Sequence, residues 1–86
     1  MSTTEPTADD RRRRNASAAR ALTRRRYACG MGAQAVADAV GVAVRTVYAW
    51  EQGVSRPRPK AYARLLDVLG LEEGALWLDE DLEVTR

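Results

Sequence analysis

Arginine side chains are the groups in this chain best suited to bind an anionic partner, and thirteen of the fourteen basic residues are arginines. A guanidinium group presents a planar fork of donors that matches phosphate oxygens and carboxylates. Residues 1–30 carry eight arginines against three acidic residues, and residues 31–64 carry five basic residues against two acidic ones. Residues 65–86 carry one arginine against seven acidic residues. One end of the molecule should therefore attract polyanions and the other repel them, although a high-GC genome would also explain the preference for arginine.

Catalytic and metal chemistry have little support, since the 86 residues include no histidine and a single cysteine. We therefore expect no enzyme activity, no metal and no cofactor. One unpaired cysteine fits a reducing cytosol. No apolar run approaches the roughly 18 residues of a membrane span, and the N-terminus lacks the apolar segment of a signal peptide. The sequence predicts a cytoplasmic protein with no membrane partner.

Two short helices with a tight connection, over about residues 33–40 and 44–52, are predicted between Met31 and Gly53. Apolar residues recur at helical spacing at positions 33, 36, 37 and 40, and again at 42, 47 and 50. Gly41 is suited to end the first helix, because glycine adopts positive φ without strain. Two helices joined so closely must cross steeply, as in a helix-turn-helix.

Residues from these helices and from the segments after them follow, in the same order along the chain, the sequence pattern of a known protein family. They are Ala37, Gly41-Val42, Thr46-Val47, Trp50-Glu51-Gln52-Gly53, Arg56-Pro57-Arg58-Pro59 and Leu69-Gly70. The stretch from about Ala18 to Leu78 thereby resembles the lambda-repressor-like (Cro-like, XRE-type) helix-turn-helix DNA-binding family. The resemblance implies an all-α fold, a compact bundle of about five short helices, with double-stranded DNA as the partner and therefore association with the nucleoid. The usual polar residues of the family are missing at positions 32, 33, 43 and 44, which leaves open a domain that no longer binds DNA.

The helix expected over residues 44–52 is implied to lie in the major groove. Periodicity turns Val47 and Trp50 inward, which leaves four candidates for base contacts near its start: Val44, Arg45, Tyr48 and Ala49. Arg45 is the strongest, because arginine can bond guanine O6 and N7 together, for about 1–3 kcal/mol of discrimination. A phosphate contact is the alternative for Arg45. In the family, the glutamate matching Glu51 pairs with a basic residue of the scaffold.

Phosphate contacts are expected from residues around this helix: Gln34, Thr46, Ser55, Arg56, Arg58 and Lys60. Two prolines stiffen the loop 54–59 and favour extended backbone before each of them. Four consecutive residues are expected to form a basic arm that lies along phosphates or enters the minor groove: Arg11, Arg12, Arg13 and Arg14. An ordinary solvated surface is the alternative for the loop and for the arm.

The chain is expected to divide into three parts. Residues 1–14 are predicted to be a disordered tail with the basic arm, residues 15–78 the helix-turn-helix domain, and residues 79–86 an acidic tail. The apolar residues near the C-terminus, from Leu76 to Val84, would either pack against the first helix or form a dimer contact.

The remaining helices are predicted from periodicity and caps. The first would span 15–29, with Asn15 or Ser17 as its N-cap, the fourth 59–69, and a short fifth 71–78. The fourth would carry Tyr62, Leu65, Leu66 and Leu69 on one apolar face. In the first helix the expected core residues are Ala18, Ala21, Leu22, Ala28 and Cys29, and the expected solvent-facing residues are Arg20, Arg24 and Arg26. At Arg25 the family register would hold a large apolar residue, so either the helix rotates or Tyr27 fills the space.

These features favour a sequence-specific transcriptional regulator of phage-repressor or Cro-like type, acting as a homodimer on an operator. The composition points to an actinobacterium or its bacteriophage. The alternative is an antitoxin or protein-interaction module that uses the acidic, apolar C-terminus to bind a protein partner.

Overall fold

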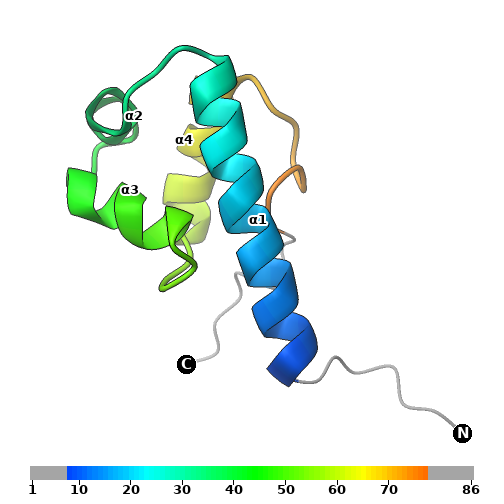
Figure 1. Cartoon of the computed structure of the whole chain (residues 1–86). Helices are drawn as coiled ribbons and strands as arrows, with labels where there is room; N and C mark the ends of the chain where they lie inside the picture. Colours follow the sequence, from blue (N-terminus) through cyan, green and yellow to red (C-terminus); the bar gives the residue numbers. More distant parts are fainter. Residues whose placement is uncertain (1–7, 78–86) are drawn as a thin grey trace, which may run out of the picture.

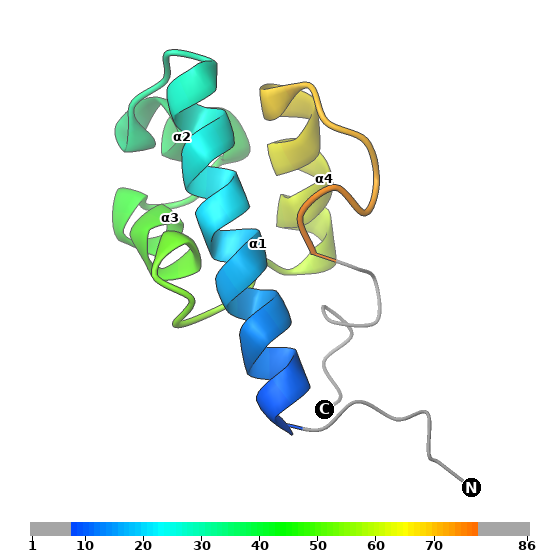
Figure 2. The same cartoon turned by 45° about the vertical axis from the view of Figure 1, so that its right-hand side comes forward.

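The computed structural model describes residues 8–77, and within this range the chain forms four α-helices and no strand. The helices are α1 (Ala8–Ala28), α2 (Ala33–Val40), α3 (Val44–Glu51) and α4 (Pro59–Leu69). The long α1 crosses the three shorter helices, and its N-terminal half extends beyond them (Figures 1 and 2). The expected all-α bundle is confirmed. The expected number of helices is wrong for residues 71–77, which form turns around Gly74 at φ +81° instead of a fifth helix.

Helix α1 begins at Ala8, seven residues before the predicted start. Asp9 and Asp10 occupy its first turn, where carboxylates favour the helix dipole, and they pair with Arg12 and Arg13 one turn later. The prediction of a disordered tail is therefore wrong from residue 8 onward, while residues 1–7 lie outside the described part. Despite its length α1 is highly charged, and no helix within residues 8–77 is long and apolar enough to cross a membrane.

The core is built from small and medium apolar side chains of all four helices. The inward positions predicted within α2, α3 and α4 are buried, which confirms the periodicity there: Ala33, Val36, Ala37, Val40, Val47, Trp50, Tyr62, Leu65, Leu66 and Leu69. Val42, expected on the same face as Val47 and Trp50, lies in the turn before α3 and is only half-buried against the core. Helix α1 contributes Ala18, Ala19 and Leu22.

The predicted inner face of α1 is only partly correct. Ala18 and Leu22 are buried, but Ala28 and Cys29 at the end of the helix are exposed, and Arg26 is buried in their place. The prediction that Arg26 faces solvent is wrong, because a carboxylate on α3 pairs with it inside the bundle. Tyr27 does not fill the space at Arg25, since it is 69% exposed. The buried face of α1 is instead turned toward Ala19 and Arg26, as the alternative of a rotated helix expects, and Arg25 Nε donates to the carbonyl of Leu69 at 2.9 Å.

The apolar residues near the C-terminus were expected either to pack within the chain or to form a dimer contact, and the structure answers this for Trp77. Its side chain is 1% exposed and packs edge-on against Tyr62, with ring centroids 6.0 Å apart. The Tyr62 hydroxyl donates to the Trp77 carbonyl at 2.8 Å and accepts from the backbone N–H groups of Leu76 and Trp77 at 3.1 and 3.0 Å. Trp77 is thus buried against its own chain. The predictions for Leu78, Leu82 and Val84 lie outside the described residues.

We expect Tyr62→Phe to lower the free energy of unfolding by about 1–3 kcal/mol, because it leaves the Trp77 carbonyl and the N–H groups of Leu76 and Trp77 without their hydrogen-bond partner. Urea unfolding followed by tryptophan fluorescence measures the loss. Tyr48→Phe removes a hydroxyl from a ring that is 48% exposed and serves as the control. Equal stability of the two variants would contradict the role assigned to the Tyr62 hydroxyl.

Candidate nucleic-acid interface

The turn between α2 and α3 has the geometry that the sequence predicts. Gly41 ends α2 at φ +90°, and the N–H groups of Gly41 and Val42 both donate to the carbonyl of Ala37. Gly32 and Ala43 are the N-caps of α2 and α3, and neither supplies a side-chain cap bond. The first N–H groups of both helices are therefore not satisfied by a cap side chain.

The outward face of α3 carries the four residues expected to read bases. Val47 and Trp50 are buried beneath it. Arg45 and Tyr48 are exposed, whereas Val44 and Ala49 are half-buried, with Val44 packed partly against the core. Arg45 and Tyr48 are therefore the more exposed side chains of this face. Thr46 is half-buried at its edge.

A buried ion pair joins α3 to α1. Arg26 donates from Nε to Glu51 Oε2 at 2.5 Å and from Nη2 to Glu51 Oε1 at 3.0 Å, and both side chains are less than a tenth exposed. Arg26 Nη1 also donates to the carbonyl of Met31, in the turn before α2. The hydrogen bonds to Glu51 raise the pKa of Arg26 above its ordinary value. The pair thus ties α3 to α1 and to the turn that precedes α2.

The loop between α3 and α4 presents its polar residues between two anchors. At its start, Gly53 adopts φ +75° and its carbonyl accepts a hydrogen bond from Asn15 Nδ2 at 2.8 Å. Near its end, Pro57 is fully buried. Ser55 and Arg56, between the anchors, are exposed, as is Arg58 just after Pro57. The structure therefore places three of the expected phosphate contacts on one fixed loop beside the end of α3.

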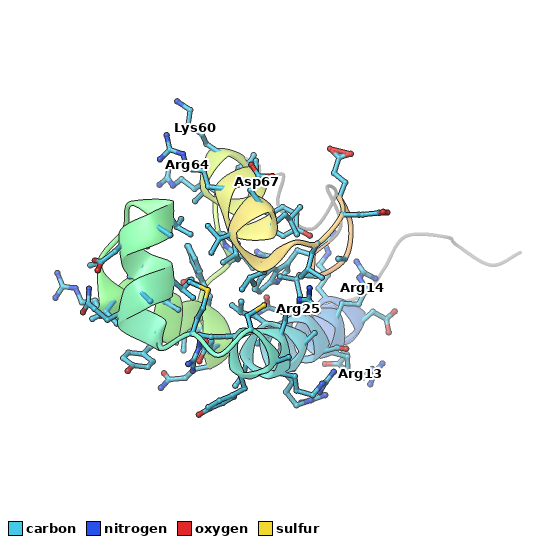
Figure 3. The ribbon with its side chains drawn as sticks, turned by 90° about the horizontal axis from the view of Figure 1, so that it is seen from above. Arg13, Arg14, Arg25, Lys60, Arg64 and Asp67 are labelled. Atoms are coloured by element: carbon cyan, nitrogen blue, oxygen red, sulfur yellow. The ribbon has the colours of Figure 1, made fainter. Side chains whose placement is uncertain are left out.

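Apart from Thr46 on α3, the other expected phosphate contacts lie on α2 and α4. Lys60 is exposed in the first turn of α4 and points away from α1, on the same side as Arg64 (Figure 3). Arg64 Nη1 donates to the carbonyl of Val40 at 3.2 Å, so this arginine closes the end of α2. Gln34 is exposed in the first turn of α2, and its amide donates to Asp38 on the same helix at 2.9 Å.

The four arginines of the predicted arm belong to α1, so the arm is a helix rather than an extended chain. Consecutive helical residues point about 100° apart, and the side chains of Arg13 and Arg14 lie on different sides of α1 (Figure 3). One duplex cannot be faced by all four at once. By helical spacing, Arg13, Arg20 and Arg24 share the side of α1 opposite its buried residues.

Four residues that organise this surface were not predicted to do so: Asn15, Arg25, Arg26 and Arg64. For Arg26 a signal existed, since Ala18, Leu22 and Arg26 fall four residues apart and Glu51 was expected to have a basic partner, which the structure confirms. The other three bind backbone carbonyls of distant segments, and local sequence carries no signal for such contacts.

A family model described as a helix-turn-helix domain matches residues 11–77. No curated protein and no solved structure matches the chain. Within residues 8–77 no group of three or more potential ligands is arranged to hold a metal ion.

We expect Arg26→Met to destabilise the fold by about 3–5 kcal/mol, because it leaves the Glu51 carboxylate buried without its partner. The double variant Arg26→Met/Glu51→Leu should recover most of this loss, since it removes both charges. Urea unfolding of the wild type and the variants measures the effect. A double variant no more stable than Arg26→Met would show that the loss does not come from the unpaired carboxylate.

Proposed function

The chain belongs to the helix-turn-helix family of the XRE, lambda-repressor-like type, and we propose from this that it is a sequence-specific transcriptional regulator of phage-repressor or Cro-like kind. The observation that carries the proposal is the outward face of α3. Its Arg45 and Tyr48 are exposed while Glu51, at its end, is tied into the scaffold. A reading helix needs this combination, because base contacts require side chains held at fixed positions.

In this proposal α3 lies in the major groove with its N-terminal end toward the base edges. Arg45 bonds guanine through O6 and N7. Tyr48 contacts a neighbouring base or phosphate, and the half-buried Val44 and Ala49 pack against thymine methyl groups.

Phosphate contacts would supply most of the affinity and none of the sequence information. The anchored loop offers Ser55, Arg56 and Arg58, and Thr46, Lys60 and Gln34 extend this set on the neighbouring helices. The N-terminal half of α1 adds those arginines of the run 11–14 that face the duplex. The exposed pairs of Arg12 with Asp9 and of Arg13 with Asp10 are weak enough to yield to phosphate.

Regulation would follow from occupying an operator and so blocking or recruiting polymerase. A homodimer would read two half-sites about 34 Å apart, or a multiple of that distance. The burial of Trp77 in its own chain supports this proposal over the antitoxin alternative, since an interaction module would offer that side chain to its partner.

Selection of duplexes from a random library tests the reading helix. We expect the wild type to enrich a defined motif, and Arg45→Ala to lose about 1–3 kcal/mol of preference at one G·C pair. Arg24→Ala, on the outer side of α1, is the matched control and should keep the motif. Enrichment of no motif by the wild type would refute the proposed function, and an unchanged motif in Arg45→Ala would refute the role of Arg45.

Salt dependence tests the loop. Arg56→Ala should weaken binding to all sequences alike and reduce the slope of log K against log salt by about 1, because one phosphate contact and its released counterion are lost. Fluorescence anisotropy on the enriched duplex, from low to moderate salt, gives both slopes. A change in sequence preference with an unchanged slope would contradict a phosphate role.

A further inference from the structure

Asn15 joins three segments that are far apart in the sequence. Its side chain is half-buried on α1 and uses both ends of its amide. Oδ1 accepts from the indole Nε1 of Trp77 at 2.7 Å, and Nδ2 donates to the carbonyl of Gly53 at 2.8 Å. The C-terminal segment and the loop after α3 therefore meet at one side chain.

The indole N–H of Trp77 fixes which way this amide points. With the amide reversed, the Asn15 N–H₂ group would face the indole N–H, and its oxygen would face the Gly53 carbonyl. Both contacts would then be repulsive. The docked tryptophan thus selects the one orientation of Asn15 that holds the loop. Tyr62 in turn keeps the tryptophan in place through the Trp77 carbonyl and N–H.

Gly53 stands at the point where α3 ends and the loop begins. The N–H groups of Val54 and Ser55 turn back to the carbonyl of Ala49, at 2.9 and 3.3 Å. The next fixed point is the buried Pro57. The placement of Ser55 and Arg56 therefore depends on how firmly the Gly53 carbonyl is held.

We propose that Asn15 is a positioning residue that couples the docked C-terminal segment 71–77 to the loop after α3. Docking of Trp77 then controls how Ser55 and Arg56 meet DNA phosphates. The DNA part rests on the proposed function, whereas the coupling itself is a property of the free protein. Any event that displaces Trp77 loosens the loop and weakens DNA binding without touching the reading face of α3.

Amide hydrogen exchange in the free, full-length protein tests the coupling. Trp77→Phe keeps an aromatic ring but removes the N–H that orients Asn15. Asn15→Asp keeps an acceptor for the indole but removes the donor to Gly53. In both variants exchange at Val54 and Ser55 should accelerate by about threefold to tenfold, as expected for the loss of one hydrogen bond.

Two controls separate this effect from general destabilisation. The N–H groups of Gly41 and Val42 close α2 on the carbonyl of Ala37 in a similar turn, so exchange at Val54 and Ser55 is expressed relative to theirs. Arg25→Met removes one hydrogen bond from α1 to the end of α4 and should leave this ratio unchanged. An unchanged ratio in Trp77→Phe, or an equal rise in Arg25→Met, would overturn the coupling.

Affinity for the duplex enriched by the wild type extends the test to DNA. Trp77→Phe and Asn15→Asp should each weaken binding by about threefold to tenfold, with the preferred motif unchanged. Adding Arg56→Ala to either variant should cost less than it costs in the wild type, because the misplaced arginine already contributes less. Full additivity would overturn the DNA part of the proposal. A wild type that enriches no duplex refutes the proposed function instead, while the exchange ratios still decide the coupling.

Discussion

The buried pair of Arg26 and Glu51 is the interaction on which the arrangement of the helices depends. Two charges less than a tenth exposed are stable only when they face each other with good geometry, and here the guanidinium meets the carboxylate with two parallel bonds. The pair fixes α3 against α1, and through the carbonyl of Met31 it also fixes the turn before α2. The hydrogen bonds to Glu51 raise the pKa of Arg26, so on the alkaline side the guanidinium keeps its charge and its contribution to stability until the solution is strongly alkaline.

Polar side chains from distant segments bind the backbone carbonyls at helix ends, which local capping residues usually do. Arg25 binds the last carbonyl of α4, Arg64 binds the last carbonyl of α2, and Asn15 binds the carbonyl after α3. These bonds satisfy backbone groups that helix ends leave open, and they tie together a core that contains no phenylalanine. Several arginines are therefore occupied with the scaffold, so the number of positive charges in the chain overstates the number available to a polyanion.

Much of the fold and part of the candidate site could be predicted from local pattern. The spacing of apolar residues placed α2 and α4 at their observed bounds and turned Val47 and Trp50 inward. Because those two residues are buried, the outward face of α3 follows from helical geometry alone. The start of α1 was missed because a run of four arginines reads as a solvated tail, whereas Asp9 and Asp10 stabilise it as a helix. A fifth helix was predicted wrongly, because Glu72 and Glu73 suit the first turn of a helix, yet the chain turns at Gly74.

The sequence by itself determined the helix-turn-helix, its tight turn at Gly41 and the exposed position of Arg45, because each depends on neighbours within a few residues. Only the tertiary structure decided which arginine is buried, what closes the ends of α2 and α4, and where Trp77 docks. Those contacts join residues between 15 and 62 positions apart. Local spacing cannot encode them, because a polar side chain on a helix is exposed or buried according to which distant group the packing brings within hydrogen-bonding distance.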